Sequence, residues 1–354
     1  MRVLVTGHNG YIGSVLVPLL QQAGHDAVGL DSRLFAACTF GAGGREIPSL
    51  TIDLRDVQAR HLAGFDAIAH LAGLSNDPLG DLSPDVTYEI NHRASVRLAR
   101  LAKRVGVRRF VHSSSCSIYG AAGDDVLTEE ASFNPVTPYG ISKVRVEEDV
   151  SRLADRHFSP TFLRNATAYG VSPRLRGDLV VNNLVGYAVT TGEVFLKSDG
   201  TPWRPLVHIE DIARAFVAVL EAPQERVHNE AFNVGRTEEN YRIREVAELV
   251  ETVVPGARVR LADSAGPDLR NYRVDCSKIA RVLPRFQPRW TVRRGIEELY
   301  AAYTGERTTL DDLTGPRYQR IKHVLALQAA GRLDAGLRWC AERVREPRMR
   351  QEVA

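Results

Sequence analysis

Near its N-terminus the chain reads Val5-Thr6-Gly7-His8-Asn9-Gly10-Tyr11-Ile12-Gly13. The apolar run from Val3 to Val5 predicts a buried strand, and the residues after Gly13 predict a helix. Three glycines between a strand and a helix allow a tight turn and bring backbone N–H groups close to a bound diphosphate. A glycine triplet is also typical of ordinary strand-to-helix turns, so its interpretation depends on the rest of the chain.

Short apolar runs alternate with amphipathic stretches over the first half of the chain. Further buried strands are predicted at Ala27 to Leu30, Ile68 to Leu71, Phe110 to Val111 and Thr161 to Leu163. The clearest helix begins at the N-cap Ser83, has Pro84 in its first position, and carries one apolar stripe up to Gly106. This alternation is typical of βαβ units, so we expect an α/β fold with a Rossmann-type, doubly wound parallel sheet.

Three parts are expected along the 354 residues. Residues 1–170 are predicted to form a dinucleotide-binding domain, to which residues 205–235 return. Residues 171–304 contain loops rich in Pro, Gly and Arg and predict a smaller substrate-binding lobe, because loops on a rigid scaffold often carry binding surfaces. Residues 305–354 predict a helical C-terminal extension, an amphipathic pair of helices whose apolar side includes Leu333, Leu337 and Val344.

The composition excludes several classes of protein. Hydrophobic residues make up 44% and charged residues 25%, as in average soluble globular chains. A net charge of +3 is too small to indicate nucleic acid or a membrane surface as the main partner. No apolar run reaches the roughly 18 residues of a membrane span, and no signal-peptide apolar region follows Met1, so we expect a cytoplasmic protein. The four cysteines form no Cys-x-x-Cys pair, so no disulfide framework and no metal site are expected.

Residues at the ends of the later strands strengthen the interpretation of the glycine triplet. Asp31 ends the second predicted strand, where its carboxylate can accept hydrogen bonds from an adenosine ribose. The same charge repels a 2′-phosphate and favours NAD over NADP, although Arg33 argues for the opposite choice. Segments after the third and fourth strands also lie where a cofactor would bind. The predicted NAD contacts are Gly7, Asn9, Gly10, Tyr11, Ile12, Gly13, Asp31, Arg33, Asp53, Leu54, Leu71, Ala72 and Gly73.

A tyrosine and a lysine lie four residues apart in Pro138-Tyr139-Gly140-Ile141-Ser142-Lys143. On a helix both side chains project from one face. A phenol with a pKa of about 10 is a poor base at neutral pH, but an adjacent ammonium and a cationic nicotinamide both favour its phenolate. Tyr139 could then exchange a proton with a substrate hydroxyl while the cofactor moves a hydride.

The same spacing recurs at Tyr318 and Lys322, so a second feature is needed to separate the two pairs. Ser113-Ser114-Ser115 supplies it, because this triplet follows the predicted strand Arg109 to His112 and precedes Tyr139 by 24 residues. A hydroxyl donor there could hold a substrate oxygen. Tyr318 has no such partner and is interpreted as structural.

With these residues together, the chain resembles the extended short-chain dehydrogenase/reductase family, in particular its NAD-dependent nucleotide-sugar epimerase/dehydratase branch, over about residues 1–304. The resemblance rests on the glycine triplet, Asp31, the serine run that closes on Ile118-Tyr119-Gly120, and the tyrosine and lysine pair. It implies that Ser115 and Tyr139 are catalytic and that Lys143 contacts the nicotinamide ribose. It also implies that Asn91, Ser113, Tyr139 and Lys143 complete the NAD site.

Two downstream segments resemble family positions that meet the diphosphate of a nucleotide sugar. Arg204 stands within residues 201–211 and Arg270 within residues 268–272. A guanidinium fork matches a phosphate bidentately, although surface solvation is the alternative for both arginines. The predicted substrate contacts are Ser75, Ser115, Thr167, Asn183, Arg204 and Arg270. His208 and Asp211 are expected to orient this loop and to cap the next helix.

Two departures from the family patterns narrow the reaction, and a third, at Thr167, concerns the contact with the substrate diphosphate. Cys116 and Ser117 stand where sugar 4,6-dehydratases carry an Asp-Glu pair, so no acid is evident for the loss of a C6 hydroxyl. Branches that epimerise through C3 and C5 place a cysteine base where this chain has Ser117, and Cys116 is expected to face the other way as a small buried residue. Thr167 stands where sugar epimerases commonly carry an Asn.

The resemblance therefore favours a C4 epimerase of a nucleotide-diphosphate sugar, in which hydride leaves C4 for NAD and returns to the other face of a 4-keto sugar. The first alternative is a 4-ketoreductase or dehydrogenase that turns NAD(H) over, and a 4,6-dehydratase is less favoured. A regulator that binds dinucleotide without catalysis is disfavoured by the intact Ser115, Tyr139 and Lys143. A homodimer is expected, with no nucleic acid or membrane partner.

Overall fold

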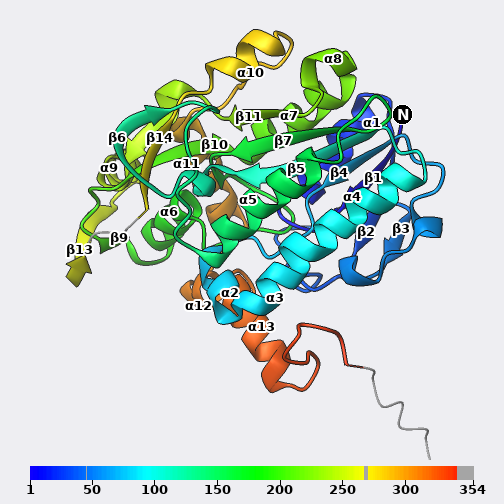
Figure 1. The fold of residues 1–354 in the computed structure, drawn as a ribbon. Coiled ribbons are helices and arrows are strands. Elements are labelled where there is room, and N and C mark those ends of the chain that lie inside the picture. Colours follow the sequence, from blue (N-terminus) through cyan, green and yellow to red (C-terminus); the bar gives the residue numbers. More distant parts are fainter. Residues whose placement is uncertain (45, 267–269, 341–354) are drawn as a thin grey trace, which may run out of the picture.

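The computed structural model describes residues 1–44, 46–266 and 270–340. At its centre is a seven-stranded sheet in the order β11-β7-β5-β4-β1-β2-β3, in which every neighbouring pair is parallel (Figure 1). Its strands are β1 (Arg2–Thr6), β2 (Asp26–Asp31), β3 (Ser49–Thr51), β4 (Ala67–His70), β5 (Arg109–Ser115), β7 (Ser159–Asn165) and β11 (Glu230–Val234). The predicted doubly wound parallel sheet is confirmed.

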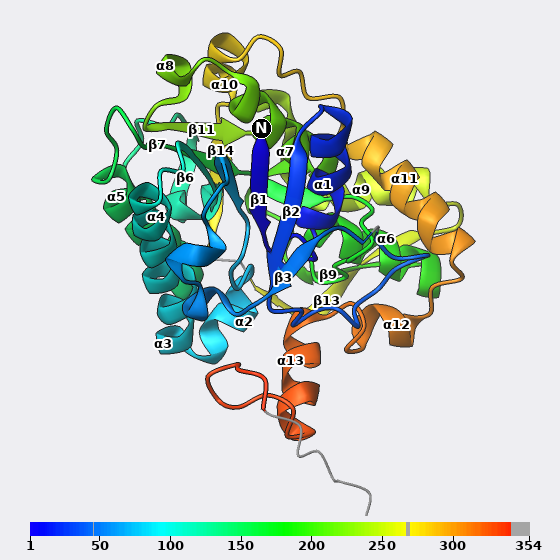
Figure 2. The same ribbon diagram turned by 90° about the vertical axis from the view of Figure 1, so that its right-hand side faces the viewer.

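Helices cover both faces of this sheet, which Figure 2 shows close to edge-on. On one face lie α1 (Gly13–Gln22) and α7 (Ile209–Glu221), and on the other lie α4 (Ala94–Arg104) and α5 (Pro138–Ser151). Each pair packs its apolar stripe against the strands in a separate buried core. Both faces are buried, which explains why the strands are continuous apolar runs instead of alternating patterns.

The strand order reverses between β1 and β4. The chain runs from β1 through β2 to β3 and then crosses back to β4 and β5 on the other side. Connections diverge at such a point and leave a crevice at the carboxyl ends of the strands, where α/β proteins bind ligands. The glycine turn, residues 7–13, follows β1, and Leu71-Ala72-Gly73 follows β4, so both predicted segments lie at this crevice.

Smaller sheets and helices form a second layer beside the main sheet, with a core of their own. The strands are β6 (Ala121–Leu127), β8 (Thr167–Tyr169), β9 (Glu193–Ser198), β10 (Trp203–His208), β12 (Asn240–Arg242), β13 (Arg258–Gly266) and β14 (Asn271–Val274). The helices of this second core are α6 (Val180–Thr191), α9 (Ile243–Val253) and α11 (Val292–Gly305), whereas the short α8 (Gln224–Val227) and α10 (Ser277–Val282) pack in the core of the main sheet. The loops predicted within residues 171–304 are thus partly strand, at β9, β10, β13 and β14. After β10 the chain returns to the main sheet with α7 and β11.

The long helix predicted after Ser83 is present but is not a uniform α-helix. α2 (Asp77–Leu82) precedes it, and it consists of α3 (Pro84–Thr87), a π-helical segment (Tyr88–Arg93) and α4. The Ser83 hydroxyl caps it by accepting a hydrogen bond from the Val86 N–H at 3.4 Å. The π-helical segment contains the buried Asn91, whose side-chain amide hydrogen-bonds both the N–H and the carbonyl of Leu74. A single π turn of this kind reorients a side chain within a helix and is frequent at functional sites.

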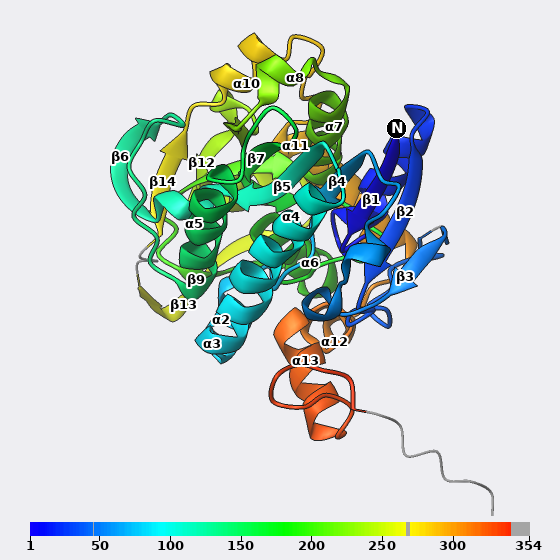
Figure 3. The same ribbon diagram turned by 45° about the vertical axis from the view of Figure 1, so that its right-hand side comes forward.

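The prediction of a C-terminal helix pair is wrong for its second helix, because residues 330–340 are not helical. α12 (Leu310–Thr314) and α13 (Arg320–Ala329) form, and Figure 3 shows α13 at the end of the molecule between α2 and the β3 side of the sheet. Gly331 then adopts a left-handed φ of 66°, and Leu333 pairs with Trp339 in an isolated bridge. The prediction for Val344 lies outside the described residues.

Among residues 1–44, 46–266 and 270–340, no helix has the length and hydrophobicity of a membrane span. The same ranges contain no group of three or more His, Cys, Asp or Glu side chains placed to hold a metal ion. All four cysteines are free, and only Cys340 is exposed.

Candidate active site

A cavity of about 810 Å³ lies at the carboxyl ends of β1, β4 and β5. Most of the predicted site residues line it, namely Gly7, Gly10, Tyr11, Ile12, Gly13, Asp31, Asp53, Leu54, Leu71, Ala72, Gly73, Ser75, Ser113, Ser115, Tyr139, Lys143, Thr167, Asn183, Arg204 and Arg270. Three predicted residues do not reach its wall: Asn9, Arg33 and Asn91. One continuous cavity thus joins the glycine turn to the serine, tyrosine and arginine positions.

The glycine turn is packed too closely for side chains. A Cβ at Gly13 would lie 2.2 Å from the Gly7 carbonyl oxygen, and a Cβ at Gly7 would lie 2.9 Å from the Ala72 nitrogen. Gly7 also has a positive φ of 73°. The turn therefore places bare backbone at the N-terminus of α1, facing the cavity, which fits the diphosphate of a dinucleotide.

The Asp31 carboxylate lines the cavity beside this turn. One of its oxygens accepts a hydrogen bond from the Asn9 N–H at 3.1 Å, and the other accepts one from the Arg33 N–H at 2.6 Å. Asn9 and Arg33 therefore act through their backbones and orient Asp31. Since the Arg33 side chain does not line the cavity, its proposed contact with a 2′-phosphate finds no support in the geometry.

Asn91 supports the cavity wall from behind. It is 2% exposed, and its side chain accepts from the Leu74 N–H at 2.7 Å and donates to the Leu74 carbonyl at 2.9 Å. Its amide also donates to the Ser142 hydroxyl at 3.2 Å. Asn91 therefore positions the segment after β4 against α5 and does not line the cavity, and its contact with the cofactor stays a prediction.

Tyr139 projects from the first turn of α5, whose N-cap Thr137 accepts a hydrogen bond from the Gly140 N–H at 3.2 Å. Burial raises the pKa of Tyr139 to about 12, although a hydrogen bond with Ser115 lowers it. The phenol is therefore protonated at neutral pH and can donate a proton. Its action as a base requires added positive charge nearby.

Lys143 lies one helical turn further along α5 and is 7% exposed. Its Nζ donates to the Ser113 carbonyl at 2.6 Å and lies 5.7 Å from the centre of the Tyr139 ring. Burial lowers its pKa from 10.5 to about 8. The ammonium is thus still present at neutral pH and lies on the same side of α5 as the phenol.

The Cys116 thiol points away from the cavity, as predicted. It is fully buried, donates to the Arg164 carbonyl at 3.1 Å, and packs beside Cys276. Burial raises the pKa of this thiol well above its ordinary value. Ser117 lines the cavity instead, and its buried hydroxyl has no hydrogen-bond partner among the described residues.

Two arginines meet at the far end of the cavity. Arg204 on β10 is 5% exposed, lies over the Tyr272 ring at 5.7 Å, and donates to the Arg270 carbonyl. Arg270 forms an ion pair with Asp77 from α2. The cavity therefore has guanidinium groups at the end away from the glycine turn, and surface solvation does not describe the buried Arg204.

The sequence model of the NAD dependent epimerase/dehydratase family matches residues 3–235, more than half of the chain. The chain belongs to this family. It is 28% identical to the UDP-glucose 4-epimerase of Bacillus subtilis over 329 residues, which cover 85% of this chain and 95% of that protein. NAD is the cofactor of the family, and the glycine turn and Asp31 fit it.

Solved structures in the family share this architecture. DesIV of Streptomyces venezuelae, a dTDP-glucose 4,6-dehydratase with NAD and TYD bound, superposes with a TM-score of 0.75 at 26% identity, covering 89% of this chain and 100% of that one. The UDP-glucose 4-epimerase of Thermus thermophilus in complex with NAD gives a TM-score of 0.72 at 24% identity over 86% of this chain and 99% of that one, which supports the fold alone.

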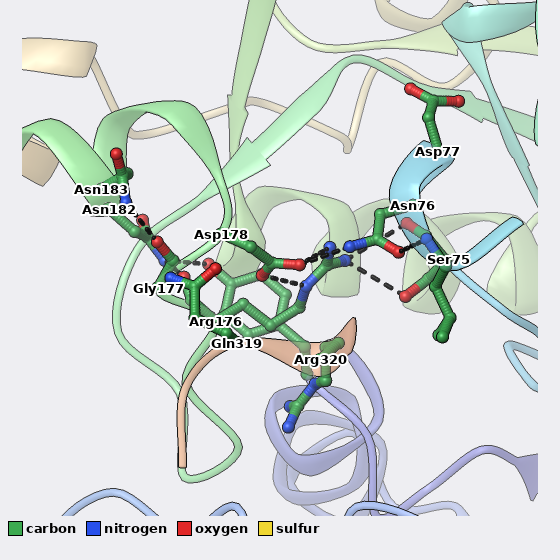
Figure 4. A network of polar contacts seen from close by, with 12 residues as sticks. Ser75, Asn76, Asp77, Arg176, Gly177, Asp178, Asn182, Asn183, Gln319 and Arg320 are labelled. Carbon is green, nitrogen blue, oxygen red and sulfur yellow. Dashed lines mark hydrogen bonds and ion pairs between the residues drawn. The ribbon is translucent and has the colours of Figure 1, made fainter. Parts of the chain in front are cut away.

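In this family member the cavity also holds a polar network that the sequence did not indicate (Figure 4). The Arg176 guanidinium forks onto the Asp178 carboxylate at 2.9 Å and donates to the Ser75 hydroxyl at 3.1 Å. Asn76 donates to the same carboxylate. The sequence signal that could have indicated this network is the spacing of Arg176 and Asp178, because side chains two residues apart in a loop can form an ion pair.

The C-terminal extension also reaches the cavity. Gln319, Arg320 and Leu337 line it, whereas Tyr318 is buried in the second core and does not. The interpretation of Tyr318 as structural is consistent with this position. The extension is thus part of the cavity wall, to which the first residue of α13 contributes.

His208 makes the expected cap on the next helix, whereas Asp211 contacts a different loop from the predicted one, residues 283–291. The His208 side chain caps α7 by accepting from the Glu210 N–H at 3.2 Å. Asp211 accepts hydrogen bonds from the Arg289 and Trp290 N–H groups at 2.9 and 3.0 Å and so orients that loop.

Proposed function

We propose that this chain is an NAD-dependent epimerase that acts at C4 of a nucleotide-diphosphate sugar. The observation that carries the proposal is the shared cavity, in which a tyrosine and a serine lie between a dinucleotide turn at one end and two arginines, the buried Arg204 and the partly exposed Arg270, at the other. The first end suits a cofactor, and the second suits the diphosphate of a substrate. The Bacillus subtilis relative is named for UDP-glucose, so UDP hexoses are the first candidates.

Each residue then has a separate task. Arg204 and Arg270 bind the substrate diphosphate, and Ser75, Thr167 and Asn183 line the space beside it. Ser115 holds the C4 hydroxyl, and Tyr139 accepts its proton when C4 is oxidised and returns it when C4 is reduced. When bound, NAD supplies the hydride acceptor and donor. The ammonium of Lys143 contacts the nicotinamide ribose and adds positive charge near the phenol.

The absence of a catalytic carboxylate beside the serine run disfavours water elimination. Cys116 is buried and faces away, and Ser117 offers only a hydroxyl to the cavity. Asp77 does line the cavity, but Arg270 pairs with it. A C4 epimerase needs no acid at C6, so the residues present are sufficient for it.

Turnover of UDP-glucose and dTDP-glucose in heavy water tests the reaction. If hydride leaves C4 and returns to the same carbon, the product is the C4 epimer with no solvent deuterium on any ring carbon. Mass spectrometry and proton NMR measure this directly. Loss of one water would identify a dehydratase, and net oxidation or reduction of added NAD(H) would identify a dehydrogenase or ketoreductase. Either result would overturn the epimerase.

Cofactor choice gives a second test. Because Asp31 lines the cavity and the Arg33 side chain does not, NAD should bind at least about tenfold more tightly than NADP. Asp31→Asn, which keeps the shape and removes the charge, should lower this ratio mainly by improving NADP binding. Calorimetric titration with both nucleotides measures it. Equal affinities in the unmodified protein would mean that Asp31 does not set the choice.

The division into domains at residues 170 and 304, the homodimer and the cytoplasmic location stay predictions. The homodimer follows from the family resemblance, and light scattering of the purified protein measures it.

A further inference from the structure

The C-terminal extension lies against the part of the cavity that contains Asp31. The Trp339 indole donates to the Ser32 carbonyl at 2.7 Å, and His323 hydrogen-bonds the Leu34 carbonyl at 2.9 Å, so the extension contacts the segment that follows β2. Arg55, after β3, donates to the Gly336 carbonyl at 2.8 Å. These contacts tie the extension to the residues next to Asp31 and Asp53.

The same extension also contacts the other side of the glycine turn. Val324, Leu327, Leu333 and Leu337 form one core with Leu74 and Leu79, which follow β4. β2 and β4 are the two neighbours of β1 in the sheet. The extension therefore bridges the carboxyl end of β1, where the glycine turn begins.

Arg320, the first residue of α13, is a buried cation that forms no ion pair within the described ranges. It is 3% exposed and lines the cavity. Its Nη2 donates to the Arg174 carbonyl at 2.8 Å, but its buried Nη1 has no hydrogen-bond partner among the described residues. Its guanidinium lies over the Phe35 ring at 4.5 Å and beside the Cys38 thiol, which is at most a weak acceptor.

The charges around Arg320 do not balance. Asp178 is the carboxylate whose negative charge is felt by Arg320. Its oxygens, however, already accept hydrogen bonds from the Arg176 guanidinium and from Asn76. Figure 4 shows the guanidinium of Arg320 pointing away from that pair. An uncompensated buried charge is costly, so the cavity has the positive charge and the free donor that an anionic ligand would satisfy.

We propose that Arg320 binds the diphosphate of the dinucleotide cofactor and that the C-terminal extension is therefore part of the cofactor site. Phe35, on which Arg320 stacks, follows Asp31 by four residues and belongs to the cofactor end of the cavity. The arginines assigned to the substrate, Arg204 and Arg270, come from the other end. The diphosphate next to Arg320 is thus that of the dinucleotide and not that of the sugar nucleotide.

Retention of the cofactor is the consequence, and this step rests on the proposed function. An epimerase returns the hydride within the same active site, so it has no need to exchange its cofactor. An extension that bridges the glycine turn and binds the diphosphate slows nucleotide release. NAD should accordingly remain bound to the full-length protein through gel filtration, and the R320M variant should lose it.

Binding of nucleotides to the full chain, freed of nucleotide, tests the assignment without turnover. R320M keeps the apolar contact with Phe35 and removes the charge. It should bind NAD and ADP about 10- to 100-fold more weakly, as expected for a lost charged hydrogen bond, and adenosine, which has no phosphate, equally well. K322M removes one charge from the exposed side of the same helix and should leave all three affinities unchanged.

One measurement and one further variant separate a lost nucleotide contact from a loss of folding. Thermal unfolding without nucleotide should show R320M at least as stable as the unmodified protein, because an unpaired buried charge is removed. If R320M does not fold, R320Q, which keeps amide donors without charge, should show the same loss of NAD affinity.

Unchanged NAD affinity in a folded variant would overturn the proposal, and so would weaker UDP binding with unchanged NAD binding, which would assign Arg320 to the substrate. Both results are binding measurements made without turnover, so failure here is distinct from failure of the proposed function, which the turnover in heavy water tests.

Discussion

Tyr139→Phe should lose about 10² to 10⁴ in kcat and keep its affinity for NAD, the usual effect of removing a positioned acid/base. The phenol lines the cavity, and desolvation raises its pKa to about 12, so it is protonated at neutral pH. Phenylalanine fills the same volume and removes only the hydroxyl that exchanges the C4 proton. Steady-state rates with a UDP hexose, together with NAD titration and thermal unfolding, separate chemistry from folding.

Tyr318→Phe is the matched control, because Tyr318 has a lysine at the same spacing and is 2% exposed in the second core. Its ring packs against Phe40 at 5.8 Å, and it does not line the cavity. The substitution should leave kcat within about twofold of the unmodified protein, as for a neutral change away from the site. A Tyr139→Phe enzyme with more than a tenth of normal activity would assign proton transfer to another group.

Most residues that line the cavity could be predicted, because their placement follows from features that are local in sequence. Gly7 to Gly13 must form a turn too tight for side chains, and that requirement appears as glycines in the sequence itself. Tyr139 and Lys143 share one helix, so their spacing fixes their relation. Parallel strands also place their carboxyl ends at one edge, which brings Asp31 and Ser115 to the cavity without any knowledge of side-chain packing.

The polar network and the extension could not be predicted, because they depend on contacts between distant segments. Arg176 meets Ser75 across about a hundred residues of sequence. Arg320 reaches Phe35 only because α13 docks across β1, and nothing in its local pattern distinguishes it from the exposed Lys322. The hydrogen bonds of Asn91 to the backbone of Leu74 also depend on the π-helical segment, which its sequence does not indicate.

Glycine-to-alanine substitutions in the glycine turn should follow the space that the structure leaves for a Cβ. At Gly13 the added carbon would lie 2.2 Å from the Gly7 oxygen and 2.6 Å from the His8 Cα, and neither backbone atom can rotate away. At Gly10 the nearest atom is the Gly7 oxygen at 3.1 Å, and at the exposed Gly305 nothing lies within 4 Å. Alanine should therefore displace the backbone strongly at Gly13, slightly at Gly10 and not at all at Gly305.

Gly13→Ala should consequently weaken NAD binding by at least about 100-fold, because the turn must open and move its N–H groups away from the diphosphate. The cost in stability should be about 1 to 3 kcal/mol, as for overpacking of a buried site. Gly10→Ala should bind with an intermediate affinity, and Gly305→Ala should match the unmodified protein. Calorimetric titration of the three variants, each checked by thermal unfolding, measures the series. A folded Gly13→Ala variant that binds NAD within about threefold of the unmodified protein would differ from it by less than about 1 kcal/mol. The glycine turn could then not be the diphosphate site.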